Sequence, residues 1–486
     1  MTRWFAALLL LPALGVAQEA TLELEDCRIS AGPAFQGINA RCAMMERPEN
    51  PDDPDGATIS LKVAVIPALD LDPMPDPIVP IAGGPGQGSI EMYASLRRAF
   101  EPLRRNRDIL LIDQRGTGQS SKMACPSDEE ELDLDGTFSE EETIRLTEEC
   151  LEKLPHDPRY FTTSVAVRDI EAVRKALGYP ALNIYGVSYG SRVAQHYARR
   201  FPGSTRAVII DGVVPPDLPL GPDIALESQR AVDQLFARCA EDAACAEAFP
   251  ELEAEFNALV EDLKVNPQTV SMLHPVTGRP AEVPLGHGQL AAAVRLMLYS
   301  PDSLALLPLM IHNAANGNYA PIAGAMQMTV GGMADSLAIG MHNAVLCTED
   351  APFYGEMNFD DARLDDTYMG GMQYESMLAM CSVWPKGFID DDLRDLLTVD
   401  VPVLALSGDV DPITPPEYAD RAIAELPNTR HIRREKLGHG LVAVGCMPEL
   451  LASFVEAADV SVVDESCFKE RTHIMPFFID STGPAQ

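Results

Sequence analysis

Short apolar runs recur through the first 212 residues, and each of them predicts a strand. Between residues 59 and 65, apolar and polar side chains alternate with the period of two that is typical of a strand. Four further runs, at residues 77–82, 109–112, 182–185 and 207–210, are mostly apolar and end in Gly, Asp or both. Apolar runs of this length that are bounded by turn residues predict buried strands.

Helical patterns lie between these predicted strands. Residues 139–142 read Ser-Glu-Glu-Glu, a capping box that opens one helix. A second helix ends at Gly178 and Pro180. Its apolar stripe has helical spacing and consists of Val167, Ile170, Val173 and Leu177. Strands that alternate with helices predict an α/β fold with a mostly parallel sheet covered on both faces.

The pattern changes after Asp211 and returns near residue 401. Residues 213–400 are helical and loop-like, with Met-rich stretches. Strand-like sequence resumes at 401–406 and 429–433, and a helix is expected at about 448–457. We therefore expect a core in two parts, residues 18–212 and 401–486, interrupted by a helical cap domain of residues 213–400.

The charge of the chain excludes some classes of partner. Its 486 residues include 37 Lys and Arg against 73 Asp and Glu, a formal net charge of −36. Binding to nucleic acid depends on basic side chains that replace counterions, so we expect no nucleic acid partner. Anionic membrane surfaces are disfavoured for the same reason. A field of this sign mildly favours cationic ligands.

The N-terminus has the pattern of a secretory signal peptide. Arg3 precedes an apolar stretch at residues 5–16, and Gly15 and Ala17 place small residues before a cut at Gln18. A membrane anchor is the alternative, but the run is shorter than the roughly 18 apolar residues that a span requires. We expect residues 1–17 to be removed and the protein to be exported to the periplasm or the medium, without stable membrane insertion.

Ten cysteines fall into five neighbouring pairs, which suits an oxidising compartment. We expect sequential disulfides, although the sequence alone leaves their connectivity open. The pairs are Cys27 with Cys42, Cys125 with Cys150, Cys239 with Cys245, Cys347 with Cys381, and Cys446 with Cys467. A metal site is the alternative, but no pair has the Cys-x2-Cys spacing that zinc sites favour. We expect neither a metal nor an organic cofactor.

The strongest candidate for chemistry follows the predicted strand at 182–185. There the chain reads Gly186-Val187-Ser188-Tyr189-Gly190, and an amphipathic helix comes next. A strand, Gly-x-Ser-x-Gly and a helix form a nucleophile elbow, a strained turn that exposes the serine oxygen. We therefore expect Ser188 to be a nucleophile. A tight turn with an incidental serine is the alternative.

A serine nucleophile needs a histidine base and a carboxylate that orients it. Asp411 and His439 both lie where a loop leaves the carboxyl end of a strand, the edge where open α/β sheets place their sites. His439 has glycines on both sides, whereas His431 lies inside a strand-like run and His473 lies in the tail. Asp411 is favoured over Asp409 because the turn places it closer to the histidine loop.

The tetrahedral intermediate needs backbone N–H donors, each worth roughly 10² to 10³ in rate. The amide of Tyr189 is one candidate, and the amide of Gly84 in the glycine-rich loop 82–88 is the other. A phosphate-binding loop is not supported, because the Gly-Lys-Ser/Thr ending is missing. A plain glycine-rich turn remains the alternative. For the Asp113-Gln114-Arg115-Gly116 segment we expect a structural role, with an Arg–Asp pair fixing a sharp loop.

Together these motifs resemble the proline iminopeptidase and tripeptidyl aminopeptidase family of α/β-hydrolase serine peptidases, over about residues 42–467. That family has Gly-Gly-Pro-Gly, Asp-Gln-Arg-Gly, Gly-x-Ser-x-Gly, Gly-x-x-Asp and Gly-His, and this chain has all of them. The exported, tripeptidyl-aminopeptidase-like branch is the most similar, because the segments around Cys239, Cys347 and Cys381 match it. Ala82 stands where proline iminopeptidases usually have His, which weakens transfer of strict proline specificity.

The resemblance implies an α/β-hydrolase fold whose large helical cap is inserted before the strand that carries Asp411. It also implies that the cap admits a free peptide N-terminus and holds its ammonium group with carboxylates. Glu349 and Asp350 are the candidates, and a solvated acidic loop is the alternative. The implied activity is that of an exported serine exopeptidase acting on short peptides. An exported esterase or a non-catalytic binding protein is the alternative, and the sequence does not indicate an oligomeric state.

Overall fold

The computed structural model describes residues 21–32, 36–125, 139–357, 359–469 and 474–484. The predicted signal peptide, residues 1–17, lies outside these ranges. Within them, no helix is both long enough and apolar enough to cross a membrane.

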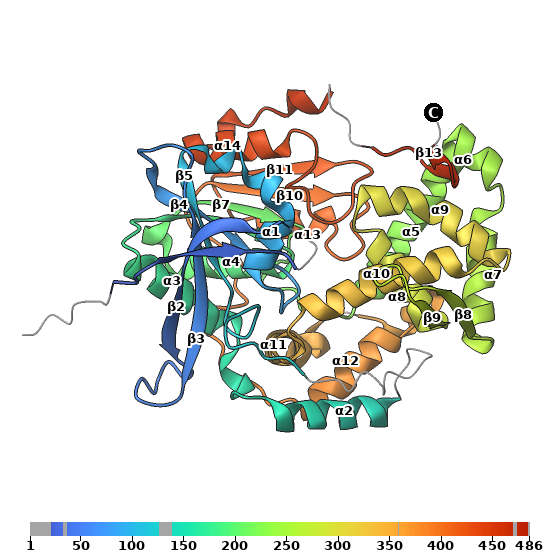
Figure 1. Ribbon diagram of the computed structural model, residues 1–486, viewed down its shortest axis with the longest axis horizontal. Helices are drawn as coiled ribbons and strands as arrows, with labels where there is room; N and C mark the ends of the chain where they lie inside the picture. Colours follow the sequence, from blue (N-terminus) through green and yellow to red (C-terminus); the bar gives the residue numbers. More distant parts are fainter. Residues whose placement is uncertain (1–20, 33–35, 126–138, 358, 470–473, 485–486) are drawn as a thin grey trace, which may run out of the picture.

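Nine strands form one sheet in the order β1-β2-β3-β5-β4-β6-β7-β10-β11 (Figure 1). The six strands from β5 to β11 in this order are parallel, whereas β1, β2 and β3 run antiparallel at one end. The mostly parallel sheet expected from the sequence is therefore confirmed. The strands are β1 (Glu25–Ile29), β2 (Ile38–Pro48), β3 (Thr58–Ile66), β4 (Met74–Ile81), β5 (Arg107–Ile112), β6 (Leu182–Val187), β7 (Thr205–Asp211), β10 (Val403–Gly408) and β11 (Thr429–Arg434).

Helices cover both faces of this sheet because successive strand residues point to opposite sides. On β6, Ile184 packs with α3 (Thr163–Ala176), α4 (Tyr189–Arg200) and α13 (Pro416–Ala422) in one apolar cluster. The next residue, Tyr185, packs on the other face with α1 (Ser89–Phe100) and α14 (Met447–Ala457). These two buried clusters hold the carboxyl ends of the parallel strands in fixed positions.

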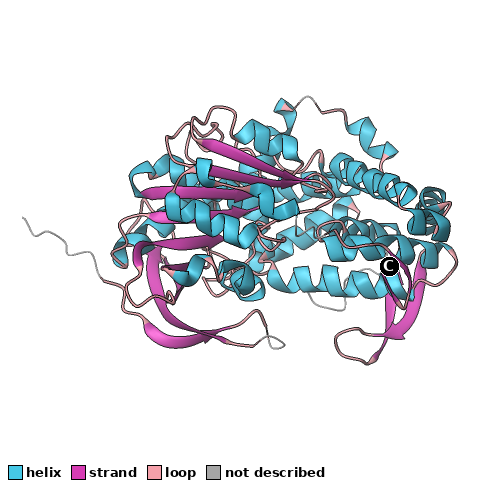
Figure 2. Cartoon of the chain, turned by 90° about the horizontal axis from the view of Figure 1, so that it is seen from above, coloured by secondary structure: helices cyan, strands magenta, loops and turns pink. Residues whose placement is uncertain are grey.

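The segment between β7 and β10 is mainly helical, and most of its helices lie to one side of the large sheet (Figure 2). These helices pack around an apolar cluster that is separate from the clusters on the sheet. The helices of this segment are α5 (Ile224–Glu241), α6 (Ala243–Ala248), α7 (Leu252–Val265), α8 (His287–Met297), α9 (Pro301–Ala315), α10 (Ala320–Ser336), α11 (Ile339–Val345) and α12 (Met372–Val383). A hairpin of β8 (Gln268–Leu273) and β9 (Pro280–Leu285), not expected from the sequence, interrupts them. A short C-terminal hairpin joins β12 (Phe478–Asp480) to β13 (Gly483–Pro484).

The helix α2 (Glu140–Lys153) precedes α3 in the chain but lies beside α12 (Figure 1). Its first turn forms the expected capping box: Ser139 accepts a hydrogen bond from the Glu142 amide, and the Glu142 side chain accepts one from the Ser139 amide. Two orphan amides at the helix start are thereby satisfied.

Five disulfides join the ten cysteines as sequential neighbours. The pairs are Cys27–Cys42, Cys125–Cys150, Cys239–Cys245, Cys347–Cys381 and Cys446–Cys467. Each links elements that are already close in the chain, so the disulfides act as local clamps.

Candidate active site

The chain makes a strained turn at Ser188, between the end of β6 and the start of α4. Ser188 has a φ of 56° and a ψ of −129°, which is rare for a residue with a side chain. Both flanking glycines are required sterically. A Cβ on Gly186 would lie 2.2 Å from the carbonyl oxygen of Gly190, and one on Gly190 would lie 2.4 Å from that of Ile81. The structure therefore contains the nucleophile elbow expected from the motif.

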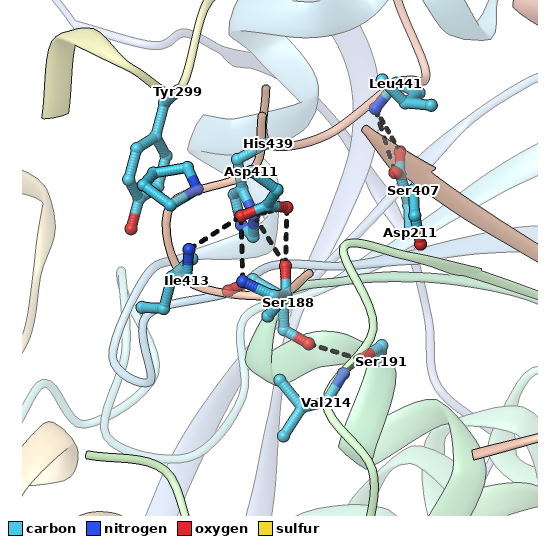
Figure 3. A network of polar contacts seen from close by, with 12 residues as sticks. Ser188, Ser191, Asp211, Val214, Tyr299, Ser407, Asp411, Ile413, His439 and Leu441 are labelled. Carbon is cyan, nitrogen blue, oxygen red and sulfur yellow. Dashed lines mark hydrogen bonds and ion pairs between the residues drawn. The ribbon is translucent and has the colours of Figure 1, made fainter. Parts of the chain in front are cut away.

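The structure brings Asp411 and His439 together. Nδ1 of His439 lies 2.7 Å from Oδ2 of Asp411, and the Asp411 side chain is fully buried (Figure 3). The amides of Ile413 and Thr414 donate to Oδ1 of the same carboxylate, at 3.0 and 2.9 Å. Burial alone would raise the pKa of Asp411, but His439 and the Thr414 donors outweigh it, and the net pKa is lowered.

The competing candidates for acid and base have other partners. The Asp409 carboxylate accepts a hydrogen bond from the Lys436 amide at 2.5 Å. His431 has Asp420 2.8 Å from its Nδ1 and Ser407 3.0 Å from its Nε2. Of the two aspartates in this turn, it is Asp411 that meets His439.

Contacts that the sequence did not reveal hold the His439 loop in place. The His439 amide donates to the Tyr299 carbonyl at 2.9 Å, and the centroids of the His439 and Tyr299 rings lie 4.7 Å apart (Figure 3). Buried Asp211, at the end of β7, accepts hydrogen bonds from the amides of Leu441 and Val442. The Thr414 hydroxyl donates to Oδ2 of Asp411 at 2.7 Å and lies 3.0 Å from Nδ1 of His439.

The glycine-rich loop after β4 lies directly against the nucleophile. A Cβ on Gly83 would lie 2.8 Å from the Ser188 Cβ, so only glycine allows this approach. Gly84 has a φ of +107° and lines the same cavity as Ser188. Tyr189 is the first residue of α4, and its hydroxyl lies 2.7 Å from Oγ1 of Thr163. Gly84 thus lines the cavity that contains Ser188, and Tyr189 directly follows Ser188 in the chain, while their roles as oxyanion donors stay a prediction.

The inserted segment also fixes this glycine-rich loop. The Ala338 amide donates to the Gly86 carbonyl at 3.0 Å, and Nδ1 of His342 lies 3.0 Å from the Pro85 carbonyl oxygen. Burial lowers the pKa of His342, so the neutral ring donates from Nδ1 to that carbonyl. The loop thus has contacts both with the core and with the helical segment.

One cavity of about 680 Å³ joins these parts. Part of its lining belongs to the core and includes Ser188, Gly84 and His439. Much of the wall comes from the inserted segment and is apolar, with Leu220, Ile224, Leu346, Met377 and Met380 among its residues. A substrate in this cavity is therefore enclosed by both parts of the chain.

A model of the alpha/beta hydrolase fold family matches residues 76–445, which is most of the chain. The chain belongs to this family. It is 30% identical over 315 residues to the serine protease Hip1 of Mycobacterium tuberculosis, covering 60% of this chain and 58% of that protein. It is 28% identical over 148 residues to a tripeptidyl aminopeptidase of Streptomyces lividans, covering 28% of each. The chain thus spans less than two thirds of these curated relatives.

Among solved structures, this alpha/beta hydrolase is similar to the proline iminopeptidase of Mycobacterium smegmatis. The two are 15% identical, the match covers 86% of this chain and 100% of the other, and the TM-score is 0.39.

The carboxylates expected to meet a substrate amine are buried in the alpha/beta hydrolase and have internal partners. Glu349 accepts hydrogen bonds from the amide and hydroxyl of Thr163, at 2.6 and 2.7 Å. Asp350 accepts two from Arg192, at 2.8 and 3.1 Å, and one from the Leu220 amide. Neither residue lines the cavity. Burial raises the pKa of Glu349 to about 7. Their positions therefore give no support to the expected contact with an ammonium group.

The Asp-Gln-Arg-Gly segment has the structural role expected of it, with a different partner for the arginine. Arg115 donates to both oxygens of Asp169 on α3, at 2.7 and 3.0 Å, and not to Asp113. Asp113 instead accepts from the amides of Ile90 and Gln119, both at 3.0 Å. Burial raises the pKa of Asp113 to about 6. Asp113 thereby ties the start of α1 to its own loop.

Among the described residues, one group of side chains has the composition of a metal site: His196, Asp390 and Asp392. Arg168 already contacts Asp390 at 2.7 Å, and Arg200 contacts Asp392 at 3.2 Å. These guanidinium groups neutralise the carboxylates that a cation would need. The group does not line the cavity of about 680 Å³ that contains Ser188, so we assign it no part in the chemistry.

Proposed function

We propose that this protein is an exported serine exopeptidase that releases residues from the N-terminus of short peptides. The observation that supports it best is the contact between His439 and buried Asp411, in a cavity that also contains Ser188 at its strained turn. The names of the relatives, a serine protease and a tripeptidyl aminopeptidase, favour a peptide bond as the target.

In this proposal, Oγ of Ser188 attacks the scissile carbonyl carbon while Nε2 of His439 takes its proton. Collapse of the tetrahedral intermediate breaks the C–N bond, and His439 gives the proton to the leaving amine. A water molecule, deprotonated by His439, then hydrolyses the acyl-enzyme. Asp411 holds Nδ1–H, so that Nε2 faces the serine. The amides of Gly84 and Tyr189 would stabilise the oxyanion.

The enclosure of the cavity favours short substrates. Leu337 and Met377 of the inserted segment line the cavity together with residues of the core. A folded protein chain would have to displace such residues, whereas a short peptide would fit between them. No Asp or Glu lines the described part of this cavity, so we do not assign recognition of the substrate ammonium group to a side chain.

The test of this proposal is hydrolysis of fluorogenic aminoacyl, dipeptidyl and tripeptidyl amides by the wild type and Ser188→Ala. We expect the variant to lose about 10³-fold or more in kcat. Ser453→Ala is a matched control, because Ser453 is an exposed serine on α14. Mass spectrometry of a digested peptide library would give the number of residues released. Full activity of Ser188→Ala would refute the proposal.

An exported esterase is the second candidate, and the apolar walls without a lining carboxylate are the observation that favours it. Blocked substrates separate the two. Loss of turnover on N-acetylated peptides supports the exopeptidase, whereas preference for p-nitrophenyl esters over all peptides supports the esterase.

Export is supported by the five disulfides, which persist in oxidising compartments. We expect the protein purified from an expressing cell's periplasm or medium to lack residues 1–17 by intact mass. A full-length mass in the cytosolic fraction would contradict export.

A further inference from the structure

Arg295, on α8, is half-buried, and among the described residues no carboxylate lies within ion-pair distance of its guanidinium. It is the one Lys, Arg, Asp or Glu among the described residues that line the catalytic cavity. Its Nη1 donates to the Tyr299 hydroxyl at 3.2 Å, and its Nε is buried without a hydrogen-bond partner. By contrast, Arg115 is paired with Asp169 and Arg192 with Asp350.

A buried donor without an acceptor costs free energy, and Nε of Arg295 has no acceptor among the described residues. Because Arg295 lines a cavity, a molecule from outside the chain can supply that acceptor. In a catalytic cavity, a bound substrate is the natural source.

The position of Arg295 indicates which part of the substrate it would meet. Tyr299, which accepts its hydrogen bond, has its ring 4.7 Å from that of His439 and its carbonyl bound to the His439 amide (Figure 3). Arg295 is thus one aromatic side chain away from the imidazole. Since His439 would protonate the leaving amine, the leaving group must lie beside that imidazole.

We propose that Arg295 binds a carboxylate on the leaving group, and that this enzyme therefore prefers peptides whose leaving part is anionic. The inference rests on the exopeptidase function proposed above. A guanidinium binds a carboxylate through paired N–H donors. The carboxylate is either the free C-terminus of a short peptide or an acidic side chain in the leaving residue. Gln373 and Ser376 of α12 line the same cavity and offer further donors.

A second cavity, of about 400 Å³, shares Arg295, Gln373 and Ser376 with the first. Its lining also includes Glu140 and Glu375. These carboxylates would repel an anion placed beyond Arg295, so the favourable position for the substrate carboxylate is at the guanidinium itself. A short leaving group satisfies this condition.

The test compares leaving groups with and without a carboxylate. The acyl part X is the one that the wild type removes fastest from a p-nitroanilide. The substrates are X-Ala with a free carboxylate, X-Ala-NH₂, and X-Asp-NH₂. We expect wild-type kcat/KM to be about tenfold or more higher for one or both anionic substrates than for X-Ala-NH₂. Preference for X-Ala identifies the terminal carboxylate, and preference for X-Asp-NH₂ identifies the side chain.

In Arg295→Gln, we expect the ratio of kcat/KM for the anionic substrates to kcat/KM for the neutral one to fall toward one. In Arg295→Lys, we expect this ratio to recover in part. Arg363→Gln is the matched control, because Arg363 is an exposed arginine of the inserted segment outside the cavity, and it should keep the wild-type ratio. Equal kcat/KM for acid and amide in the wild type would overturn the inference and leave the exopeptidase function standing.

A second measurement separates failure of the inference from failure of the proposed function. A fluorophosphonate labels the active serine irrespective of the natural substrate, and X-Ala and X-Ala-NH₂ compete with it. If no peptide is cleaved but X-Ala protects Ser188 better than the amide, and Arg295→Gln abolishes the difference, the anion site stands and the function fails. If the two protect equally, the anion site is refuted.

Discussion

Nδ1 of His439 lies 2.7 Å from Oδ2 of Asp411, and the side chain of Asp411 has no exposed surface. Burial by itself would lower the pKa of His439, but the charge and hydrogen bond of Asp411 outweigh it and raise that pKa above 6.5. In the mechanism that we propose, the pair would stabilise the imidazolium that forms when Ser188 loses its proton.

Replacing the Asp411 carboxylate by an amide should abolish most of the activity. In Asp411→Asn, the side chain retains its size but no longer stabilises the imidazolium or fixes the tautomer of His439. We expect kcat to fall by about 10⁴-fold, measured on the best fluorogenic peptide. Asp409→Asn is the control in the same turn, since Asp409 contacts the Lys436 amide and not His439. If Asp409→Asn lost activity and Asp411→Asn remained active, the orienting carboxylate would be Asp409 and not Asp411.

The activity should fall on the acid side of a pH that His439 sets. The base must be neutral to accept the serine proton, so kcat/KM decreases as pH falls through the His439 pKa. Because Asp411 raises that pKa, the midpoint of the acid limb should lie above pH 6.5. Measurements of kcat/KM from pH 5 to 9 at constant ionic strength check this. A midpoint well below 6.5 would contradict it.

The Thr414 hydroxyl should act as a positioning group for the pair. It donates to Oδ2 of Asp411 and lies 3.0 Å from Nδ1 of His439. Thr414→Val keeps the shape and leaves the buried carboxylate one donor short, which should reduce kcat by about 10- to 100-fold. Thr414→Ser, which keeps the hydroxyl, should recover most of the rate. A shift of the acid limb in the Val variant, with unchanged thermal stability, would separate positioning from a folding defect.

Local patterns predicted the turn at Ser188 and the proximity of Asp411 to His439, because this geometry depends on neighbours in the chain. The strained turn at Ser188 needs glycines two residues away on each side, and the strand and helix around it follow from periodicity. Asp411 and His439 each follow a buried strand of the parallel sheet. Parallel strands bring such loops to one edge of the sheet, so the contact between Asp411 and His439 could be expected from the sequence.

Groups contributed by distant segments could not be predicted in the same way. Tyr299 and Arg295 reach the site because the helical insertion packs on the core, and no local pattern marks them. Glu349 and Asp350 were expected at the cavity, but Arg192 and Thr163, more than 150 residues earlier, bury them. Their acidic character is visible in the sequence, whereas their partners are not.

The hairpin of β8 and β9 had a signal that could have revealed it. Val270 and Met272 alternate with polar residues before a Pro-Val-Thr-Gly turn, and Gly278 in that turn has a φ of +65°. A glycine with positive φ between two alternating segments is typical of a hairpin. The edge strand β1 and its neighbour β2 gave a weaker signal, because many of their side chains are exposed.

The pair of Arg192 and Asp350 should be a determinant of stability. Asp350 is fully buried, and its two oxygens accept from Arg192 at 2.8 and 3.1 Å. Asp350→Asn removes the nearer carboxylate of the buried guanidinium and leaves it only Glu349, at 4.0 Å. Loss of one partner of a buried ion pair typically costs about 3–5 kcal/mol, so we expect the variant to unfold at a clearly lower denaturant concentration.

A matched control for this variant is Glu356→Gln. The exposed Glu356 carboxylate lies 2.7 Å from Nη1 of Arg394, and the substitution removes its charge. Exposed ion pairs contribute little, because solvent screens them and the side chains lose freedom, so its unfolding midpoint should stay near that of the wild type. The Asp350→Asn variant also tests the role in binding a substrate amine that the sequence suggested. If Asp350→Asn kept wild-type stability but raised KM only for peptides with a free amine, Asp350 would bind the substrate ammonium group, and its pairing with Arg192 would not be its main contribution.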